Sequence, residues 1–134
     1  MIRRILALLI GAAAAFGLVT VVERLGQGVY PPPPHLDLTS SEQVAKYIEH
    51  APLGAFAFIL GAWVVAVVIG GMIAAFIARK VIFAVIIGLL VLAGSAVNLF
   101  MIPHPTWFSV TGIIVVIAAI LITKRLARIV FGLT

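Results

Sequence analysis

The chain has 134 residues, of which 64% are hydrophobic and only 10% are charged, and its mean hydropathy is +1.32. Soluble domains carry about 25% charged residues, so this composition excludes a soluble domain and indicates a lipid bilayer as the main solvent. The formal net charge is +5 and there is no cysteine, which excludes disulfides and thiol redox chemistry.

Four apolar stretches predict membrane-spanning helices. They cover residues 5–22, 53–78, 81–102 and 107–123. Roughly 20 apolar residues cross about 30 Å of hydrocarbon, where every backbone polar group has to be bonded within the chain, so each stretch is expected to be helical. The first stretch, which follows Arg3 and Arg4, also fits a secretory signal peptide. Its apolar run continues to Val22, so we interpret it as a retained helix.

The basic residues predict the topology. All Lys and Arg residues except Arg24 and Lys46 lie before the first span, between the second and third, or after the fourth. The positive-inside rule therefore places both termini in the cytoplasm and the segments 23–52 and 103–106 outside. The basic excess reports topology, and nucleic acid is not an expected partner. We predict an all-α membrane protein, a four-transmembrane-helix bundle that forms one membrane domain over 1–134 and ends in a cytoplasmic tail at 124–134.

The second span carries small residues on two faces, and small residues let helices pack closely in lipid. One stripe has heptad spacing and comprises Gly54, Ala57, Gly61, Val64, Val68, Gly71, Ala75 and Ala78. The other has an interval of four and comprises Ala62, Ala66, Gly70, Ala74 and Ala78. We expect the second helix to lie at the centre of the bundle, with helix contacts at Gly54, Gly61, Ala66, Gly70, Gly71, Ala74 and Ala78. The pairs Gly11 and Ala15, Ala84 and Gly88, and Gly112 and Ala119 could contact either this chain or a partner.

The outer loop contains four consecutive prolines, Pro31–Pro34. Such a run favours an extended polyproline II rod of about 3.1 Å per residue, and we interpret it as a stiff strut across the mouth of the bundle. The alternative is a ligand for a proline-recognition domain. Further along, Thr39 and Glu42 have the spacing of a capping box. Apolar residues then recur at helical spacing, which predicts a short amphipathic helix over about 40–50 on the outer membrane surface or the bundle mouth.

Residues that could form a site gather on the outer side. The candidate site comprises Glu23, Tyr30, His35, Asp37, Trp63, Asn98, His104 and Trp107. Glu23 could carry protons, or it could pair with Arg24, Lys46 or a histidine at the interface, which is the role we expect. Asn98 fits either an interhelical hydrogen bond or a ligand contact. The aromatic residues fit a belt at the membrane interface, and Trp63 lies deep enough to line a cavity instead.

The chain shows no catalytic constellation, so an enzyme is not expected. Its outer-side serines lack a nucleophile motif. No span has a charged residue near its middle, which argues against a small proton-coupled exporter and against a charge-lined channel. The three histidines share the outer side with all four acidic residues, yet none has a ligand spacing such as His-x-x-His. No metal site and no cofactor is therefore expected.

Two segments resemble a family of small four-helix bacterial membrane proteins with no established activity. One is the outer loop that runs from Glu23 through the tyrosine and prolines of 30–34 to Asp37. The other follows Asn98 and reads as an HP-x-WF turn over 104–108. The resemblance covers nearly the whole chain, includes Trp63, and implies a multi-pass protein of the bacterial inner membrane.

From these patterns we expect a non-enzymatic accessory or scaffolding subunit, which packs against a larger membrane protein complex or forms a homo-oligomer. The alternative is a binder or transporter of a small apolar molecule or lipid, entered through the outer mouth near Glu23, Asn98 and His104. A bundle closed by side chains beneath the outer loop would count against that alternative. A third hypothesis is metal or haem binding at the outer histidines.

Overall fold

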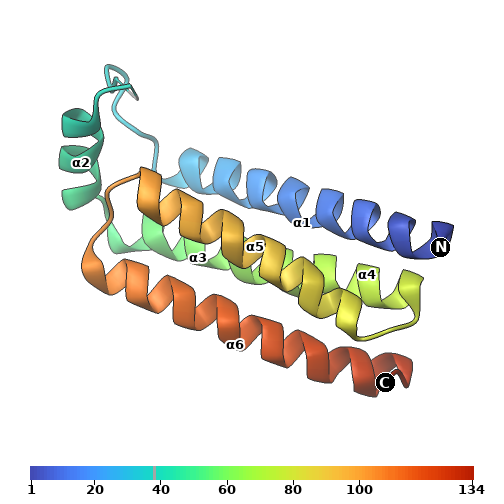
Figure 1. Ribbon diagram of the computed structural model, residues 1–134. Helices are drawn as coiled ribbons and strands as arrows, with labels where there is room; N and C mark the ends of the chain where they lie inside the picture. Colours follow the sequence, from blue (N-terminus) through green and yellow to red (C-terminus); the bar gives the residue numbers. More distant parts are fainter. Residues whose placement is uncertain (38) are drawn as a thin grey trace.

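The computed structural model describes residues 1–37 and 39–134, and the regular structure within them is entirely helical. Four helical spans are long and apolar enough to cross a membrane. They are α1 (Ile2–Val29), a composite of α3 (Leu53–Val65), η1 (Ala66–Gly70) and α4 (Gly71–Ala78), then α5 (Ile82–Met101) and α6 (Thr106–Phe131). The short helix α2 (Ser41–Glu49) lies across one end of the bundle, and both termini lie at the other end (Figure 1). The prediction of an all-α fold with four membrane-length helices is confirmed.

The first and last spans run further than the hydropathy pattern predicts. Helix α1 continues from the expected Val22 to Val29, and α6 continues from Thr123 to Phe131. Polar residues such as glutamate, lysine and arginine are good helix formers, so a helix need not stop where the apolar run stops. Helix α1 ends before Tyr30, whose φ of −125° and ψ of 74° are not helical, and the proline that follows disfavours a helical conformation at this residue. Helix α6 ends at Gly132, which has the left-handed φ of 63° typical of a helix C-terminus.

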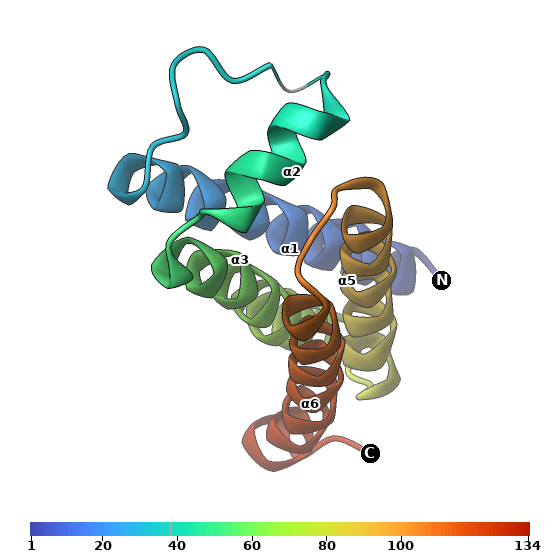
Figure 2. The ribbon, with the colours of Figure 1, turned by 90° about the vertical axis from the view of Figure 1, so that its left-hand side faces the viewer.

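The composite second span lies at the centre of the bundle. It contacts α1, α5 and α6, and it has the largest buried share of the four spans. Viewed towards the end that carries α2, helices α3 and α5 lie between α1 and α6 (Figure 2). The central position expected from its small residues is confirmed.

Helix α1 approaches the second span most closely at a reciprocal contact of small residues. A Cβ added to Gly70 would lie 2.7 Å from the Cβ of Ala15 and 2.9 Å from the carbonyl oxygen of Gly11. In return, a Cβ added to Gly11 would lie 2.8 Å from the Cβ of Ala74. Each helix thus offers a small-xxx-small pair, and the backbones touch where neither has a side chain.

Nearer to α2, a second reciprocal contact pairs glycines with aromatic rings. The ring of Phe58 covers Gly26, where an added Cβ would lie 2.8 Å from the Cβ of Phe58. The hydroxyl end of Tyr30 covers Gly54 in the same way. The two rings meet edge to face with centroids 6.1 Å apart. A glycine and an aromatic residue four positions apart on each helix therefore hold the antiparallel α1 and α3 together.

The two predicted stripes of the second span behave differently. The stripe at intervals of four, from Ala62 to Ala78, is buried throughout, whereas the heptad stripe is fully buried only in its last part, from Gly71 onwards. Gly71 packs against Thr123 and Ala84. Gly61 is the exception among the predicted contact residues, because an added Cβ would meet no atom of the chain within 4 Å.

A π-helical turn at Ala66–Gly70 explains why the interval of four persists. Buried pairs recur every four residues from Ala62 and Trp63 to Ala74 and Ala75. In an α-helix, positions four apart drift around the axis by about 40° per step. A π turn inserts one extra residue and rotates the following residues back towards the original face. The same face therefore contacts α1 on both sides of the π turn.

The two buried polar side chains in the spans, Ser95 and Thr123, are satisfied locally. Ser95 donates a 2.8 Å hydrogen bond to the carbonyl of Val91, and Thr123 donates a 2.7 Å bond to the carbonyl of Ala119. Both bonds connect residues four apart on one helix. No buried polar side-chain atom in the described part of the chain lacks a partner, as hydrocarbon requires.

Gly70→Ala is expected to destabilise the bundle, with Gly61→Ala as its matched control. Both changes bring the same gain in helix propensity, but only the first forces a Cβ into the backbone of α1. We expect the free energy of unfolding to fall by about 1–3 kcal/mol for Gly70→Ala and not to fall for Gly61→Ala. Thermal unfolding in detergent, followed by tryptophan fluorescence, measures both. Equal melting temperatures for the two variants would contradict the close contact.

Candidate functional site

A pocket of about 400 Å³ lies at the end of the bundle that carries α2. Its walls come from the ends of α1, α3 and α5, from α2, and from the segments that join them. The lining residues are Glu23, Gly26, Gln27, Tyr30, Pro32, Leu36, Val44, Tyr47, Ile48, Ala51, Ala55, Phe56, Phe58, Ile59, Asn98, Ile102 and His104. Most of this surface is apolar, and a few polar groups converge on it, as is usual for small-molecule sites.

The proline segment forms a bent wall of this pocket instead of a straight strut. The amide of Leu36 donates a 3.1 Å hydrogen bond to the carbonyl of Pro33, which closes a turn through Pro34 and His35. Proline favours the second position of such a turn because its φ is already set. The predicted four-residue rod is therefore wrong in its second half, and the turn brings Leu36 back to the pocket, where Pro32 also lies.

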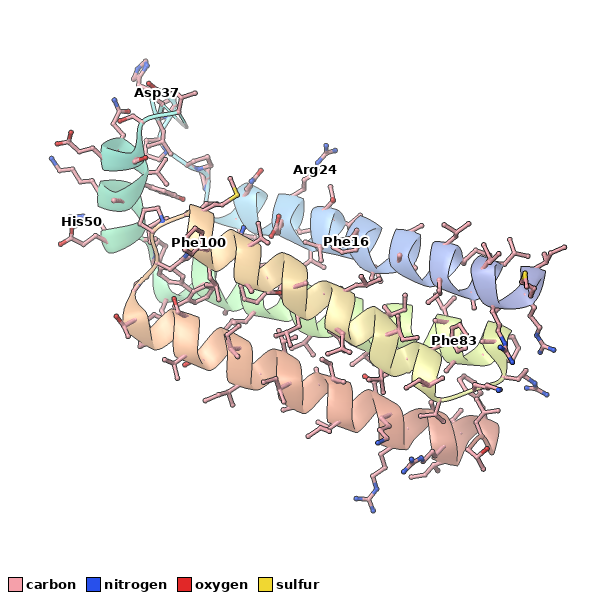
Figure 3. All side chains as sticks on the ribbon, viewed as in Figure 1. Phe16, Arg24, Asp37, His50, Phe83 and Phe100 are labelled. Carbon is pink, nitrogen blue, oxygen red and sulfur yellow. The ribbon has the colours of Figure 1, made fainter. Side chains whose placement is uncertain are left out.

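Asp37 fastens the end of this loop to the start of α2. Its carboxylate accepts hydrogen bonds from the amide and the hydroxyl of Thr39, at 2.9 and 2.6 Å. Its own amide donates a 2.9 Å bond to the side chain of Gln43. The side-chain bond from Thr39 lowers the pKa of Asp37, because it favours the ionised carboxylate. Figure 3 shows Asp37 at the tip of the loop, so its role is to shape the loop and not to contact a pocket ligand.

Helix α2 begins one residue later than the predicted capping box requires. Ser40 is the N-cap, and its hydroxyl accepts a 3.3 Å hydrogen bond from the amide of Gln43. The hydroxyl of Thr39 instead donates a hydrogen bond to the carboxylate of Asp37. From this start, Val44, Tyr47 and Ile48 face the bundle and line the pocket, while Lys46 and the acidic residues of α2 are exposed.

Glu23 lines the pocket without the ion pair expected from the sequence. Among the described residues, no hydrogen bond or ion pair reaches its carboxylate. Arg24, the next residue, points away from the bundle (Figure 3). Lys46 lies on the exposed face of α2. The expected pairing with either residue is therefore absent from the described structure.

Asn98 lines the pocket from α5. Within the described part of the chain its side chain makes no hydrogen bond that would join α5 to another helix. The amide can therefore donate or accept a hydrogen bond within the pocket.

His104 closes the pocket from the turn between α5 and α6. Its Nδ1 lies 2.7 Å from the carbonyl oxygen of Ile102. A carbonyl only accepts, so Nδ1 carries the hydrogen and Nε2 of the neutral ring is an acceptor. The ring stacks on Phe108 with centroids 5.0 Å apart. Burial lowers the pKa of His104, while the bond to Ile102 opposes that effect.

Four of the eight predicted site residues meet in the pocket, namely Glu23, Tyr30, Asn98 and His104. His35 is exposed on the loop. Trp63 is buried in the core, 3% exposed, where its ring packs against Gly112. Trp107 lines a separate, shallower hollow of about 420 Å³ on the other side of His104. Ile48 and His104 line both spaces and form the wall between them.

Sequence reasoning missed the aromatic cluster that supports this wall. Phe108 is fully buried, and its ring lies 5.0 Å from that of Phe56, 5.8 Å from that of Trp63 and 5.9 Å from that of Trp107. It also missed Tyr47, Phe56 and Phe58 as pocket residues. The helical spacing of Tyr47 and Ile48 was a usable signal for the face of α2. The spacing of Gly54 and Phe58 was a usable signal for the contact with α1.

The histidines and acids expected on the outer side are not assembled into a metal site within the part of the chain that the structure describes. Among residues 1–37 and 39–134, no group of three or more histidine, aspartate or glutamate side chains is placed to hold a metal ion. Figure 3 shows His50 on the outer face of α2, well separated from Asp37. The geometry therefore offers no support for the metal hypothesis.

The depressed pKa of His104 predicts a loss of stability at mildly acidic pH. The unfolded chain protonates this histidine near its ordinary pKa of about 6.5, whereas the folded protein resists protonation to a lower pH. Between these values the unfolded state binds more protons, so stability falls as the pH falls. Above the ordinary pKa the ring is neutral in both states and the effect vanishes.

The predicted pH dependence of stability is tested by comparing the protein with its His104→Gln variant between about pH 5 and 8, where histidine titrates. As the pH falls, the melting temperature of the parent should fall relative to that of the variant. Only the parent has the half-buried His104 ring, whose protonation favours the unfolded state. The other histidines, together with Glu23, Glu49, Tyr30 and Tyr47 around the two pockets, are common to both proteins. Melting curves that stay parallel over the whole range would contradict the prediction.

Comparison of the chain with protein-family models, with curated proteins and with solved structures finds no match. The function therefore has to be inferred from the geometry of the pocket and the chemistry of its walls.

Proposed function

We propose that this protein binds a small, mainly apolar molecule in the pocket beneath α2. The observation that carries the proposal is the pocket itself, whose volume of about 400 Å³ lies in the range of ligand sites in proteins. A bundle closed by side chains at this end would have favoured the accessory-subunit hypothesis. The open pocket favours the binding alternative.

The polar groups of the pocket support a ligand with one polar end. Glu23, Asn98 and Nε2 of His104 have no hydrogen-bond partner within the described chain, although they lie beside apolar walls. These residues are half-exposed at the pocket, and each can form a hydrogen bond with a molecule that enters it. A ligand that carries its own polar group would bond to them, and its apolar part would cover the aromatic and aliphatic lining.

The packing below the pocket favours binding over passage through the bundle. Buried side chains fill the middle of the bundle, among them Trp63, Val67, Ile87 and Val91. The pocket thus ends on a packed floor.

The exposed apolar side chains of α1 and α6 give no independent support for a partner subunit. Residues such as Leu9, Leu25 and Leu121 are more than half exposed, as a helix that faces lipid requires. A lipid bilayer is therefore a sufficient partner for these faces. We propose that the protein lies in the bacterial inner membrane. The distribution of its basic residues favours a topology with both termini in the cytoplasm and α2 outside.

Ala55→Trp, with Ala57→Trp as its matched control, tests the proposal. Ala55 lines the pocket, whereas Ala57 lies two residues further on the same helix and is exposed outside it. The probe is a neutral, medium-chain primary alcohol that carries a photoreactive diazirine. In nanodiscs, peptide mass spectrometry should find the label on the pocket ends of α1 and α3.

We expect Ala55→Trp to reduce this labelling by about tenfold or more, because it removes apolar contact area worth roughly 25 cal/mol per Å². Ala57→Trp should leave the labelling unchanged. Labelling that is confined to lipid-facing peptides in the parent protein would overturn the proposal. So would equal labelling of the two variants.

A further inference from the structure

The pocket contains one charged side chain, and that charge is negative. Glu23 lines it, and no lysine or arginine is among its lining residues. The nearest basic residues along the chain and across α2, Arg24 and Lys46, are both exposed. We propose that the ligand is a lipophilic amine, an apolar body with a protonated primary or secondary amino group that binds against Glu23. This assignment rests on the binding function proposed above.

The hydrogen-bonding groups around Glu23 match an ammonium head better than an anion. An ammonium group donates all of its N–H bonds and accepts none. The carboxylate of Glu23 only accepts when ionised, and Nε2 of His104 only accepts because Nδ1 already donates to Ile102. Asn98 and the hydroxyls of Tyr30 and Tyr47 can accept as well as donate. Every polar side chain that lines the pocket, including that of Gln27, can therefore accept a hydrogen bond from a cation.

The aromatic walls add a second preference for positive charge. Tyr30, Tyr47, Phe56 and Phe58 all line the pocket. The faces of such rings attract cations, and the attraction increases where water is excluded. Aromatic rings and a carboxylate together distinguish an amine from an alcohol of the same shape, which would gain only the apolar contacts and neutral hydrogen bonds.

An anionic ligand of the same length is disfavoured by the same groups. Its carboxylate would lie beside that of Glu23, and two negative charges at short range repel each other. The repulsion is stronger in a half-buried pocket than in bulk water. A cation beside a carboxyl group has the opposite effect and favours its ionised form. A divalent metal ion would need several anionic or neutral ligands at once, and no group of three is assembled in the described chain. The amine therefore fits best.

Three probes with one chain and one diazirine position, differing only in their head group, test this assignment. They are an amine, an alcohol and a carboxylate, used at neutral pH in nanodiscs of zwitterionic lipid. Labelling of pocket peptides is divided by labelling of the lipid-facing part of α6, so that unequal partitioning into the bilayer cancels. We expect the amine to label the pocket about tenfold more than the alcohol, the ratio that corresponds to roughly 1.4 kcal/mol. The carboxylate should label it less than the alcohol.

Glu23→Gln should abolish the excess of amine labelling over alcohol labelling, because the charge that distinguishes the two head groups is removed. Glu42→Gln is the matched control, because Glu42 is exposed on α2 and is not a lining residue of the pocket. Its head-group preference should equal that of the parent. Glu23→Asp keeps the charge and should retain a preference for the amine, which separates loss of charge from loss of structure.

The outcomes separate the two proposals. If no probe labels the pocket above the α6 reference, the binding function itself fails. If the alcohol labels the pocket but the amine does not exceed it, the binding function stands and the amine assignment fails. An amine preference that survives in Glu23→Gln also overturns the assignment.

Discussion

The structure depends on how closely α1 can approach the composite second span. In lipid no hydrophobic force draws two helices together, so association relies on direct packing of their surfaces. Here the approach is set at two places on α1. At Gly11 the contact is backbone against small side chain, and at Gly26 a phenylalanine ring covers a glycine. The first contact brings the helices together and the second sets their separation near α2. The pocket lies beside the second contact, where rings instead of methyl groups define the spacing.

The π turn connects this packing to the site. Because it keeps one face of the second span against α1 over the whole interface, the other faces of α3 remain available to α6 and to the pocket. Trp63 fills the space over Gly112 of α6, and the aromatic cluster around Phe108 continues this packing up to His104. The His104 ring is therefore supported by the aromatic cluster. Another wall of the pocket is formed by the bent proline loop, which is hydrogen-bonded to α2 through Asp37.

Sequence patterns predicted four membrane-length helices and the central position of the second one, because hydropathy and small-residue spacing report directly on lipid contact and close packing. They failed where the outcome depends on a competition between local alternatives. Ser40, and not Thr39, caps α2, because the Thr39 hydroxyl is hydrogen-bonded to Asp37 while the Ser40 hydroxyl accepts from the amide of Gln43. Pro33 entered a turn because the following residues return to the bundle. Trp63 was expected at the interface or in a cavity wall, because the sequence does not show that it packs against Gly112 of another helix. Of the site, Glu23, Tyr30, Asn98 and His104 were predicted, whereas the other aromatic wall residues depend on how the helices pair.

The contrast between the core and the pocket is the strongest argument for a ligand. Within the spans, the buried hydroxyls of Ser95 and Thr123 bond to their own helices, and the glycines at the helix contacts, such as Gly11 and Gly70, are covered by the neighbouring helix. Within the described residues, Glu23, Asn98 and one nitrogen of His104 have no protein partner, and all three lie at a single place. These residues are half-exposed at the pocket and not enclosed in the core, so their polar groups can bond to a molecule that enters it. The three groups come from α1, α5 and the turn before α6, so no local feature of one helix explains their convergence. The ligand proposed above would be a partner for all three.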